Sequence, residues 1–326
     1  MIPEIGWLRR LLVPFVHHII LTVRRVRTKS AHANPHLHPE NRPIGYRRTM
    51  FSVVVILPVH NESWLIGSVL GQVTDFANSH PSWRFVFADD GSTDDTTRKI
   101  RAHLETAAPK NIELHALTPN RGKARALKKV ILESNEGLVL FTDGDLAYRL
   151  EHLDMLAEEL EHADIVIGSR HLAEERQTNI TFLRRMTGST FNLIVRLLTG
   201  LPHQDTQAGL KGFQRNAARA IFRAQVVTDF AFDAELLFLA KKLGLVVTEI
   251  PARVSARHSY KKSKVSLIKD PLRMFISLIR MRLLHRKLKK RPERGTPGYT
   301  GNKAKGSKRS DAHAHAQETV HPNQNK

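Results

Sequence analysis

Two carboxylates one residue apart, Asp143 and Asp145, are the side chains in this sequence best suited to bind a metal ion. They follow the apolar run Leu138 to Phe141, which has the length of a short buried strand. Gly144 lies between them, where a side chain would crowd a ligand. Acidic groups at the end of a buried strand are costly without a cation or polar ligand, and Mg²⁺ is usually held by one or two carboxylates together with substrate phosphates and water. Taken alone, the turn is equally compatible with a metal–diphosphate site and with a solvated turn that caps the next helix.

Two further polar turns follow predicted strands. The run Ser52 to Val59 is continuous and β-branched, as in a parallel strand buried on both faces, and it leads into the polar residues 60–62. The run Arg84 to Ala88 leads into the acidic turn at 89–96. The other predicted elements are helices at 64–76, 96–106 and 120–134 and strands at 112–117 and 164–167. This alternation predicts βαβ units and a parallel sheet, in which ligands bind beyond the carboxyl ends of the strands. We therefore expect the three turns to converge on one crevice.

Composition and missing motifs narrow the chemistry. The chain has neither a glycine-rich dinucleotide fingerprint nor a P-loop, which argues against a redox Rossmann enzyme and a P-loop nucleotidase. It has no cysteine, so thiolate ligands, thiol nucleophiles and disulfides are excluded. Its formal net charge of +20 favours polyanionic partners, namely nucleic acid, an anionic membrane or phosphorylated substrates.

An ordered set of motifs extends over about 51–285. Its pieces are Leu57–Glu62, Asp89–Thr96, Asn120–Lys123, Thr142–Leu146, Gly168–Arg170, Asp205–Lys211, Phe230–Leu237 and Ser263–Val265. Together they resemble the inverting family 2 glycosyltransferases of the GT-A fold, and among these the enzymes that glycosylate dolichyl phosphate. The Asp205–Lys211 and Phe230–Leu237 pieces favour the glucosyl branch over the mannosyl branch. Three departures bear on donor preference: His60 replaces an aromatic residue, Asp-Gly-Asp replaces Asp-Ala-Asp, and Gln-Ala-Gly-Leu-Lys replaces Gln-Cys-Gly-Phe-Lys.

The resemblance implies a Rossmann-like α/β domain over 50–265, with a mostly parallel sheet flanked by helices. It implies inverting transfer of a hexose, with glucose from UDP-glucose favoured, to a polyprenyl or dolichyl phosphate. The alternatives are a GDP-mannose-dependent mannosyltransferase and a family 2 enzyme acting on a polysaccharide or neutral lipid, which would need a base such as Asp233. A nucleic-acid-binding protein is supported only by the positive charge, because no recognition motif accompanies it.

The resemblance also assigns roles to residues. Those expected to bind the nucleotide sugar are Pro58, His60, Glu62, Asp89, Asp90, Lys123, Asp143, Gly144, Asp145 and Gln207. Asp143 and Asp145 are expected to hold Mg²⁺ or Mn²⁺. The acceptor phosphate is expected to contact Arg170, Arg184 and Lys264, and the catalytic residues are expected to be Asp145, Asp233 and Arg184. Asp233 and Glu235 lie in an apolar helical stretch, where they could orient cations, contact sugar hydroxyls or assist the acceptor.

The ends of the chain suggest contact with a membrane surface. Residues 1–27 contain an apolar run shorter than the roughly 20 residues that a spanning helix needs, and we expect an amphipathic segment there. Residues 28–49 are expected to be a linker, and the polar stretch 292–326 is expected to be disordered. Residues 266–291 combine helically spaced apolar residues with many cations, which predicts a basic interfacial helix. The alternative for both helices is packing on the domain. We expect peripheral attachment at the cytoplasmic face of a membrane.

Overall fold

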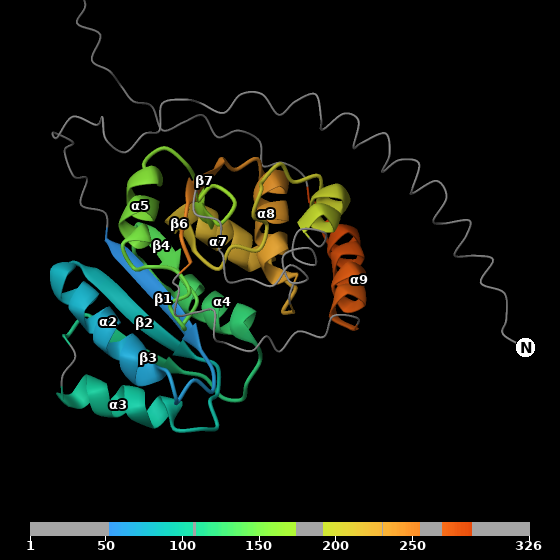
Figure 1. Cartoon of the computed structure of the whole chain (residues 1–326). Coiled ribbons are helices and arrows are strands. Elements are labelled where there is room, and N and C mark those ends of the chain that lie inside the picture. The colour runs from blue at the N-terminus through green and yellow to red at the C-terminus, as the bar shows by residue number, and fades with distance from the viewer. Residues whose placement is uncertain (1–51, 107–108, 174–191, 230, 255–268, 289–326) are drawn as a thin grey trace, which may run out of the picture. The chain divides into compact units, whose positions relative to one another are not determined.

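The computed structural model describes residues 52–106, 109–173, 192–229, 231–254 and 269–288 (Figure 1). These residues belong to the first of the chain's two units, Met1–Lys290, and the second unit, Arg291–Lys326, lies outside them. The predicted segments 1–27, 28–49 and 292–326 therefore remain predictions, as do the roles of Arg184 and Lys264.

The described residues contain one sheet of seven strands in the order β3-β2-β1-β4-β6-β5-β7. The strands are β1 (Val53–Val59), β2 (Trp83–Asp89), β3 (Ile112–Ala116), β4 (Leu138–Phe141), β5 (Ile165–Ser169), β6 (Lys211–Gln214) and β7 (Val247–Pro251). β1 pairs in parallel with β2 and β4, β2 with β3, and β5 with β7. β6 runs antiparallel between β4 and β5, with Phe141 and Ile167 both opposite Lys211. The mostly parallel sheet is confirmed, and β6 enters it from the edge where the parallel strands end.

Helices cover both faces of this sheet (Figure 1). They are α2 (Ile66–Ser79), α3 (Thr96–Thr106), α4 (Lys123–Glu133), α5 (His152–Glu159), α7 (Arg215–Ala224), α8 (Phe232–Leu243) and α9 (Lys269–Leu284). Along β1, Val53, Val55 and Leu57 pack into a core with α2 and α5, and alternate residues pack into a second core with α4, α7 and α8. Burial on both faces explains why β1 is apolar without alternation.

The helix α9 packs on the second of these cores. Its residues Leu278 and Met281 are fully buried there, and Phe275 packs against it. The three lie on one side of the helix because positions three and four apart share a face. α9 lies within the predicted 266–291, and the domain-packing alternative is correct for this one face.

Candidate active site

The acidic turn after β4 is held against the end of β1. A Cβ built on Gly144 would lie 2.2 Å from the carbonyl oxygen of Pro58 and 2.7 Å from the side chain of Val59. We expected a side chain here to crowd a ligand, but the atoms in the way belong to β1. Gly144 thus lets the turn of Asp143 and Asp145 lie directly beside the turn that follows β1, which brings the first and third of the predicted turns together.

In the folded chain the carboxylate of Asp143 lies between the side chain of Lys123 and the backbone of Gly209. Its Oδ1 is 2.5 Å from the Nζ of Lys123, the first residue of α4. Its Oδ2 would be 1.9 Å from a Cβ built on Gly209, so the backbone of the 203–210 loop covers the carboxylate. Loss of solvent would lower the pKa of Lys123, but the charge of Asp143, with those of Asp233 and Asp145, raises it. Lys123 is therefore a cation at neutral pH.

The acidic turn at 89–96 fixes the backbone at residues 121 and 122, directly before Lys123. Both carboxylate oxygens of Asp90 accept hydrogen bonds, from the backbone N–H groups of Arg121 at 3.0 Å and Gly122 at 2.6 Å. Asp89 accepts from the backbone N–H of Ser92 at 3.0 Å and from its hydroxyl at 2.6 Å. The two carboxylates are 1% and 4% exposed. They shape the turns that precede α3 and α4, and the turn held by Asp90 leads directly into Lys123, which lies beside Asp143.

His60 faces the turn before α4. Its Nε2 lies 2.9 Å from the amide nitrogen of Asn120, so the turns that follow β1 and β3 meet at these two side chains. The backbone N–H of Glu62 donates to the hydroxyl of Thr96 at 2.8 Å, which ties the same turn to the start of α3. Pro58, His60 and Glu62 thus line the edge of the sheet where a ligand of these turns would bind.

A second ion pair lies near the first, at the end of β4. The Nζ of Lys211 is 2.6 Å from Oδ1 of Asp233, and the lysine side chain has no exposed surface. Lys123 and Lys211 lie 5.8 and 5.7 Å from the ring centroid of Phe141. Both ammonium groups therefore lie near one aromatic ring at the end of β4, and Asp233 raises the pKa of Lys123, so Asp143 and Asp233 belong to one cluster.

Arg170 forms a third pair. Its Nε and Nη2 donate to the two carboxylate oxygens of Asp205 at 2.7 and 2.9 Å. Burial alone would raise the pKa of Asp205, but the hydrogen bonds and charge of Arg170 lower it. The arginine side chain is 44% exposed while that of the aspartate is 1% exposed. Asp205 Oδ1 also accepts from the backbone N–H of Gln207 at 3.3 Å, so this predicted sugar-binding residue lies beside the pair.

Glu235 does not belong to this cluster. It has no exposed surface, and it accepts hydrogen bonds from the backbone N–H groups of Val226 at 3.0 Å and Val227 at 2.9 Å and from His285 at 2.7 Å. Of the roles considered for it, contact with the sugar or the acceptor is wrong because ligands cannot reach it.

Three site residues were missed by sequence reasoning: Asn120, Asp205 and Lys211 lay in quoted motifs but had no assigned role. Lys211 had a usable signal, because a lysine that follows the apolar stretch Ala208 to Leu210 and precedes Gly212 and Phe213 is expensive to bury without a partner. The contact of Asn120 with His60 depends on folding and had no such signal.

The described residues contain no cluster of three or more acidic, histidine or cysteine side chains that could hold a metal ion. The donors available are the carboxylates of Asp143 and Asp145, and a hard cation completed by ligand phosphates needs only one or two of these. None of the helices among these residues has the length and apolarity to cross a membrane.

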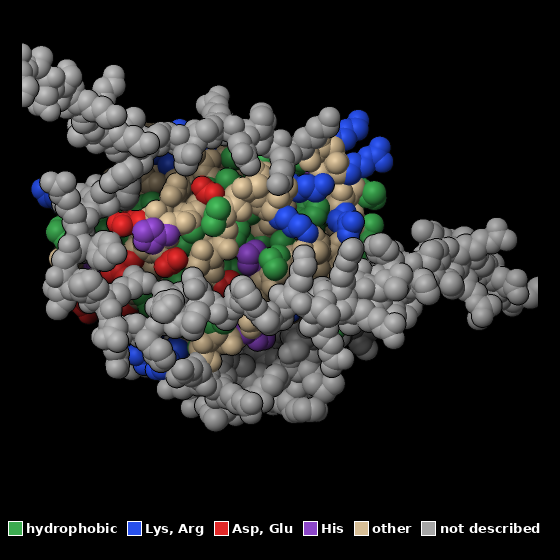
Figure 2. Space-filling model, turned by 90° about the horizontal axis from the view of Figure 1, so that it is seen from above, with side chains coloured by type: hydrophobic (Ala, Val, Ile, Leu, Met, Phe, Trp, Pro, Cys, Tyr) green, Lys and Arg blue, Asp and Glu red, His purple; other side chains and the backbone are tan. Residues whose placement is uncertain are grey.

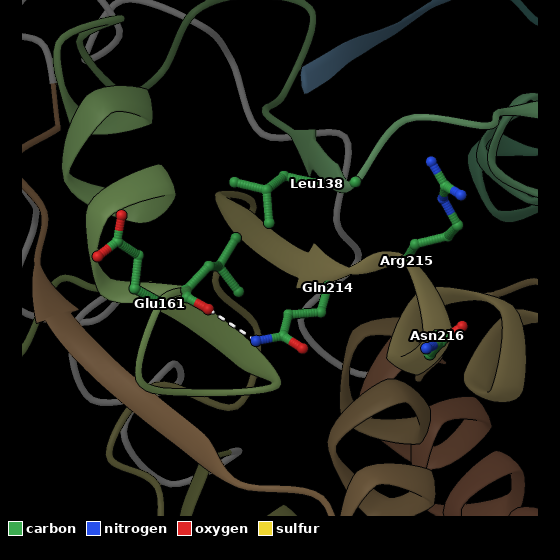
Figure 3. A pocket seen from close by; sticks show the side chains of 7 residues that line it. Leu138, Glu161, Gln214, Arg215 and Asn216 are labelled. Carbon is green, nitrogen blue, oxygen red and sulfur yellow. Dashed lines mark hydrogen bonds between the residues drawn. The ribbon is translucent and has the colours of Figure 1, made fainter. Parts of the chain in front are cut away.

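A cavity in the described part of the chain lies away from these ion pairs. It has a volume of about 530 Å³ and lies at the other end of β4, where Leu138 opposes Gln214 (Figure 3). The Gln214 side chain donates to the carbonyl of Leu160 at 2.8 Å across it. Its lining includes none of the predicted site residues, so the three ion pairs at the carboxyl edge, rather than this cavity, mark the candidate site.

The chain is similar to known glycosyltransferases. The family model Glycosyl transferase family 2 matches residues 54–222. The dolichyl-phosphate beta-glucosyltransferase of Dictyostelium discoideum is 32% identical over 237 residues, which cover 68% of this chain and 72% of the relative. The Saccharomyces cerevisiae protein of the same name is 27% identical over 250 residues, covering 71% and 74%.

A solved structure supports the fold. The glucosyl-3-phosphoglycerate synthase of Mycobacterium tuberculosis, in complex with UDP, superposes with a TM-score of 0.52 at 19% identity, covering 76% of this chain and 85% of that one. At this identity the likeness supports the GT-A architecture alone.

Proposed function

The chain belongs to glycosyltransferase family 2, and from this premise we propose that it transfers glucose, with inversion, from UDP-glucose to a dolichyl or other polyprenyl phosphate. The observation that carries the proposal is the similarity, over 68% of the chain, to a dolichyl-phosphate beta-glucosyltransferase. An oxygen of the acceptor phosphate attacks C1 of the sugar, and the bond from C1 to the diphosphate breaks, with its electron pair leaving on the nucleotide.

On the donor side, the turns that contain Pro58, His60, Glu62 and Asp90 would surround the nucleotide. The contact between His60 and Asn120 supports this, because it joins two turns at the edge where ligands of open α/β sheets bind. Lys123 is a cation beside the acidic turn, where it can neutralise a diphosphate oxygen.

Asp143 and Asp145 would hold Mg²⁺ or Mn²⁺. The close approach of Gly209 to Asp143 supports this, because any larger residue would fill the space around the carboxylate. When bound, the ion would offset the charge that develops on the departing diphosphate.

On the acceptor side, the enzyme must bring two anions together. A phosphate monoester has its second pKa near 6, so at neutral pH it is mostly dianionic and already nucleophilic. A strong base is then unnecessary, and cations matter more. Arg170 is suited to this task because the guanidinium is 44% exposed although Asp205 orients it. Arg184 and Lys264 lie outside the described residues and stay proposed phosphate contacts.

Asp233 acts in this scheme by orienting groups at the site. Its carboxylate contacts Lys211 and raises the pKa of Lys123. A transfer to a neutral acceptor would instead require Asp233 as a base, and a steep activity loss in Asp233→Asn with a bell-shaped pH profile would favour that alternative.

The exposed face of α9 is suited to an anionic membrane surface. Ile276 and Leu283 are 57% and 61% exposed. Exposed cations near these residues are Arg280 and Arg282 in α9 and Arg286 and Lys287 in the turn that follows it. Figure 2 shows Lys and Arg side chains beside hydrophobic ones on the side of the view where α9 lies in Figure 1. Each cation near anionic lipid gains about 1 kcal/mol, and the cytoplasmic leaflet carries the negative charge, so we place the protein there as a peripheral protein.

The test is transfer of labelled sugar into an organic-extractable product. Purified full-length protein is mixed with dolichyl phosphate and either UDP-glucose or GDP-mannose, with Mg²⁺, with Mn²⁺ or with EDTA. We expect label in lipid from UDP-glucose only, and only with metal. Label from GDP-mannose alone would favour the mannosyl alternative, and UDP binding without lipid labelling would refute the acceptor.

A further inference from the structure

α9 is joined to the catalytic domain by polar contacts as well as by burial. The hydroxyl of Ser277 donates to Oδ2 of Asp229, and the guanidinium of Arg282 donates to the carbonyl of Leu198. One turn further on, His285 Nε2 lies 2.7 Å from Oε1 of Glu235. His285 is 4% exposed and Glu235 is fully buried.

One of these contacts ends on the stretch that leads into α8, and another ends on Glu235 of α8, which itself binds that stretch. We call residues 225–229 and 231 the α8 lead-in. Glu235 accepts from the backbone N–H groups of Val226 and Val227 while it contacts His285. Asp229 accepts from the backbone N–H of Ala231 at 2.9 Å through Oδ1 while it contacts Ser277 through Oδ2. Each carboxylate therefore shapes the lead-in with one group and binds α9 with another.

The α8 lead-in also contacts α4 and the turn before it, which position Lys123. A Cβ built on Gly122 would lie 3.4 Å from the carbonyl oxygen of Thr228, so the lead-in packs on the turn that Asp90 holds. Lys128 of α4 donates to the carbonyl of Gln225 at 2.7 Å. Beyond the lead-in, the first turn of α8 contains Asp233, whose carboxylate contacts Lys211.

We propose that His285 is a positioning residue for the transfer reaction, acting through Glu235 on the first turn of α8 and so on Asp233. Glu235 and Asp233 lie in the same turn of α8, two residues apart. Because Glu235 is buried and binds His285 directly, loss of that partner lets the carboxylate move and carries the turn with it. The activity measurements that follow rest on the proposed function, whereas the exchange measurement does not.

The kinetic experiment compares His285→Leu, which removes the donor to Glu235, with His285→Gln, which keeps an N–H donor. The control is His103→Leu. His103 lies on α3, away from the site, and its Nε2 is 2.8 Å from the hydroxyl of Thr74. Thermal unfolding first establishes that each variant is folded. We expect His285→Leu to lower kcat about ten- to a hundredfold with an unchanged KM for UDP-glucose, because small misplacements are costly in catalysis. His285→Gln should recover most of that loss, and His103→Leu should lose none.

A double-mutant cycle distinguishes positioning from general damage. In an Asp233→Asn background, His285→Leu should change kcat by less than about twofold, since both changes act through one group. If the two losses multiply, or if folded His285→Leu keeps its full kcat, the proposal is wrong.

Hydrogen exchange tests the same proposal without any substrate. His285→Leu should speed exchange at the amides of Val226 and Val227 and in the first turn of α8, and leave α2 unchanged. Unchanged exchange at those amides would overturn the proposal even if the wild-type protein failed to glucosylate a lipid. Wild-type inactivity with the expected exchange pattern would instead refute only the proposed function.

Discussion

The ammonium of Lys211 lies 2.6 Å from the carboxylate of Asp233 and has no exposed surface. Burial lowers the pKa of Lys211, and Asp233 opposes that shift. The pair links the first residue of β6 to the first turn of α8, so an element of the sheet and a helix of the covering layer meet at one charge contact. Since ligands do not reach Lys211, its influence on the reaction passes through Asp233.

Separating this pair should affect stability and activity differently. Lys211→Met leaves Asp233 without its partner and should cost about 3 kcal/mol of the free energy of unfolding, the lower end of the range for buried pairs, because Asp233 is 18% exposed. The double variant Lys211→Met with Asp233→Leu should regain most of that stability but no activity. Urea unfolding and lipid labelling measure the two quantities. Equal recovery of both would contradict a role for Asp233 in transfer.

Gly209→Ala should damage the acidic turn without disturbing the fold. The new Cβ would lie 1.9 Å from Asp143 Oδ2, so the carboxylate must move. We expect kcat to fall about a hundredfold and Mn²⁺ binding, followed by calorimetry in the presence of UDP, to weaken. Gly71→Ala is the matched control, since nothing lies within 4 Å of its Cβ position in α2, and there alanine should stabilise by about 0.5–1 kcal/mol. Normal Mn²⁺ binding in Gly209→Ala would show that Asp143 is not a ligand.

Removal of either acidic side chain of the turn should abolish metal-dependent transfer. Asp143→Ala and Asp145→Ala should each lower kcat about 10²- to 10³-fold. This is the loss that follows removal of one group that stabilises the charge of a transition state. Asp75→Ala in α2, which is exposed, serves as the control for loss of a carboxylate. Residual activity that is the same with Mg²⁺ and with EDTA is expected for the two variants. Wild-type activity in EDTA would argue against the metal.

The Arg170–Asp205 pair predicts a pH-dependent loss of stability. In the wild type the pKa of Asp205 lies below its ordinary value, so its contribution is present above about pH 4 and is lost as the pH falls through the folded pKa. In Arg170→Met the hydrogen bonds and the charge of the guanidinium are lost, so the pKa of Asp205 rises above its wild-type value, although the backbone N–H groups of residues 170 and 207 still donate to this carboxylate. The free energy of unfolding of Arg170→Met at pH 7 should therefore be about 2 kcal/mol lower than that of the wild type. This loss is smaller than for a fully buried pair because the Arg170 side chain is 44% exposed.

The difference between Arg170→Met and the wild type should shrink as the pH falls below 4, because Asp205 is then protonated in the unfolded chain and in the variant. Urea unfolding at a series of pH values measures this difference. A constant difference at every pH would mean that the arginine stabilises by packing rather than by charge.

Membrane binding should depend on the exposed apolar residues of α9. Ile276→Glu and Leu283→Glu should each weaken binding to phosphatidylserine-containing vesicles about tenfold, the equivalent of one buried aliphatic side chain. Val246→Glu is the control, because Val246 is 57% exposed like Ile276 but lies next to β7. Co-sedimentation measures the effect. Equal losses in the control would indicate a general effect of added negative charge.

Much of the fold could be predicted because its signals are local. The apolar run Leu138 to Phe141 and the helix at 96–106 were predicted with the bounds that the structure gives. The convergence of the three turns followed from the parallel arrangement, since strands in parallel end at one edge. The antiparallel entry of β6 had no local signal, because four residues pair equally well in either direction.

The partners of the site residues could not be predicted, because they depend on contacts between distant segments. Arg170 meets Asp205, and Lys211 meets Asp233, only after folding. Gly144 illustrates the same limit: a glycine between two acids suggested room for a ligand, whereas the structure has the backbone of Pro58 there. A sequence shows which groups are expensive to bury, and only the fold shows what compensates for them.

Because β6 runs antiparallel to its neighbours, the segment that contains Arg170 begins and ends at one edge of the sheet. β5 ends at Ser169 and β6 begins at Lys211 beside it, so the residues between them start and finish at the same edge of the sheet. Closing a longer loop between neighbouring ends costs little extra, so this intervening segment can lengthen without disturbing the strands, provided that its buried residues Val195, Leu198 and Leu201 are kept. The turns after β1, β2 and β4 lie outside it. Acceptor preference can therefore diverge by insertions near Arg170, in evolution or by grafting, while Gln207, Gly209 and the three turns are kept and the same nucleotide sugar continues to be used.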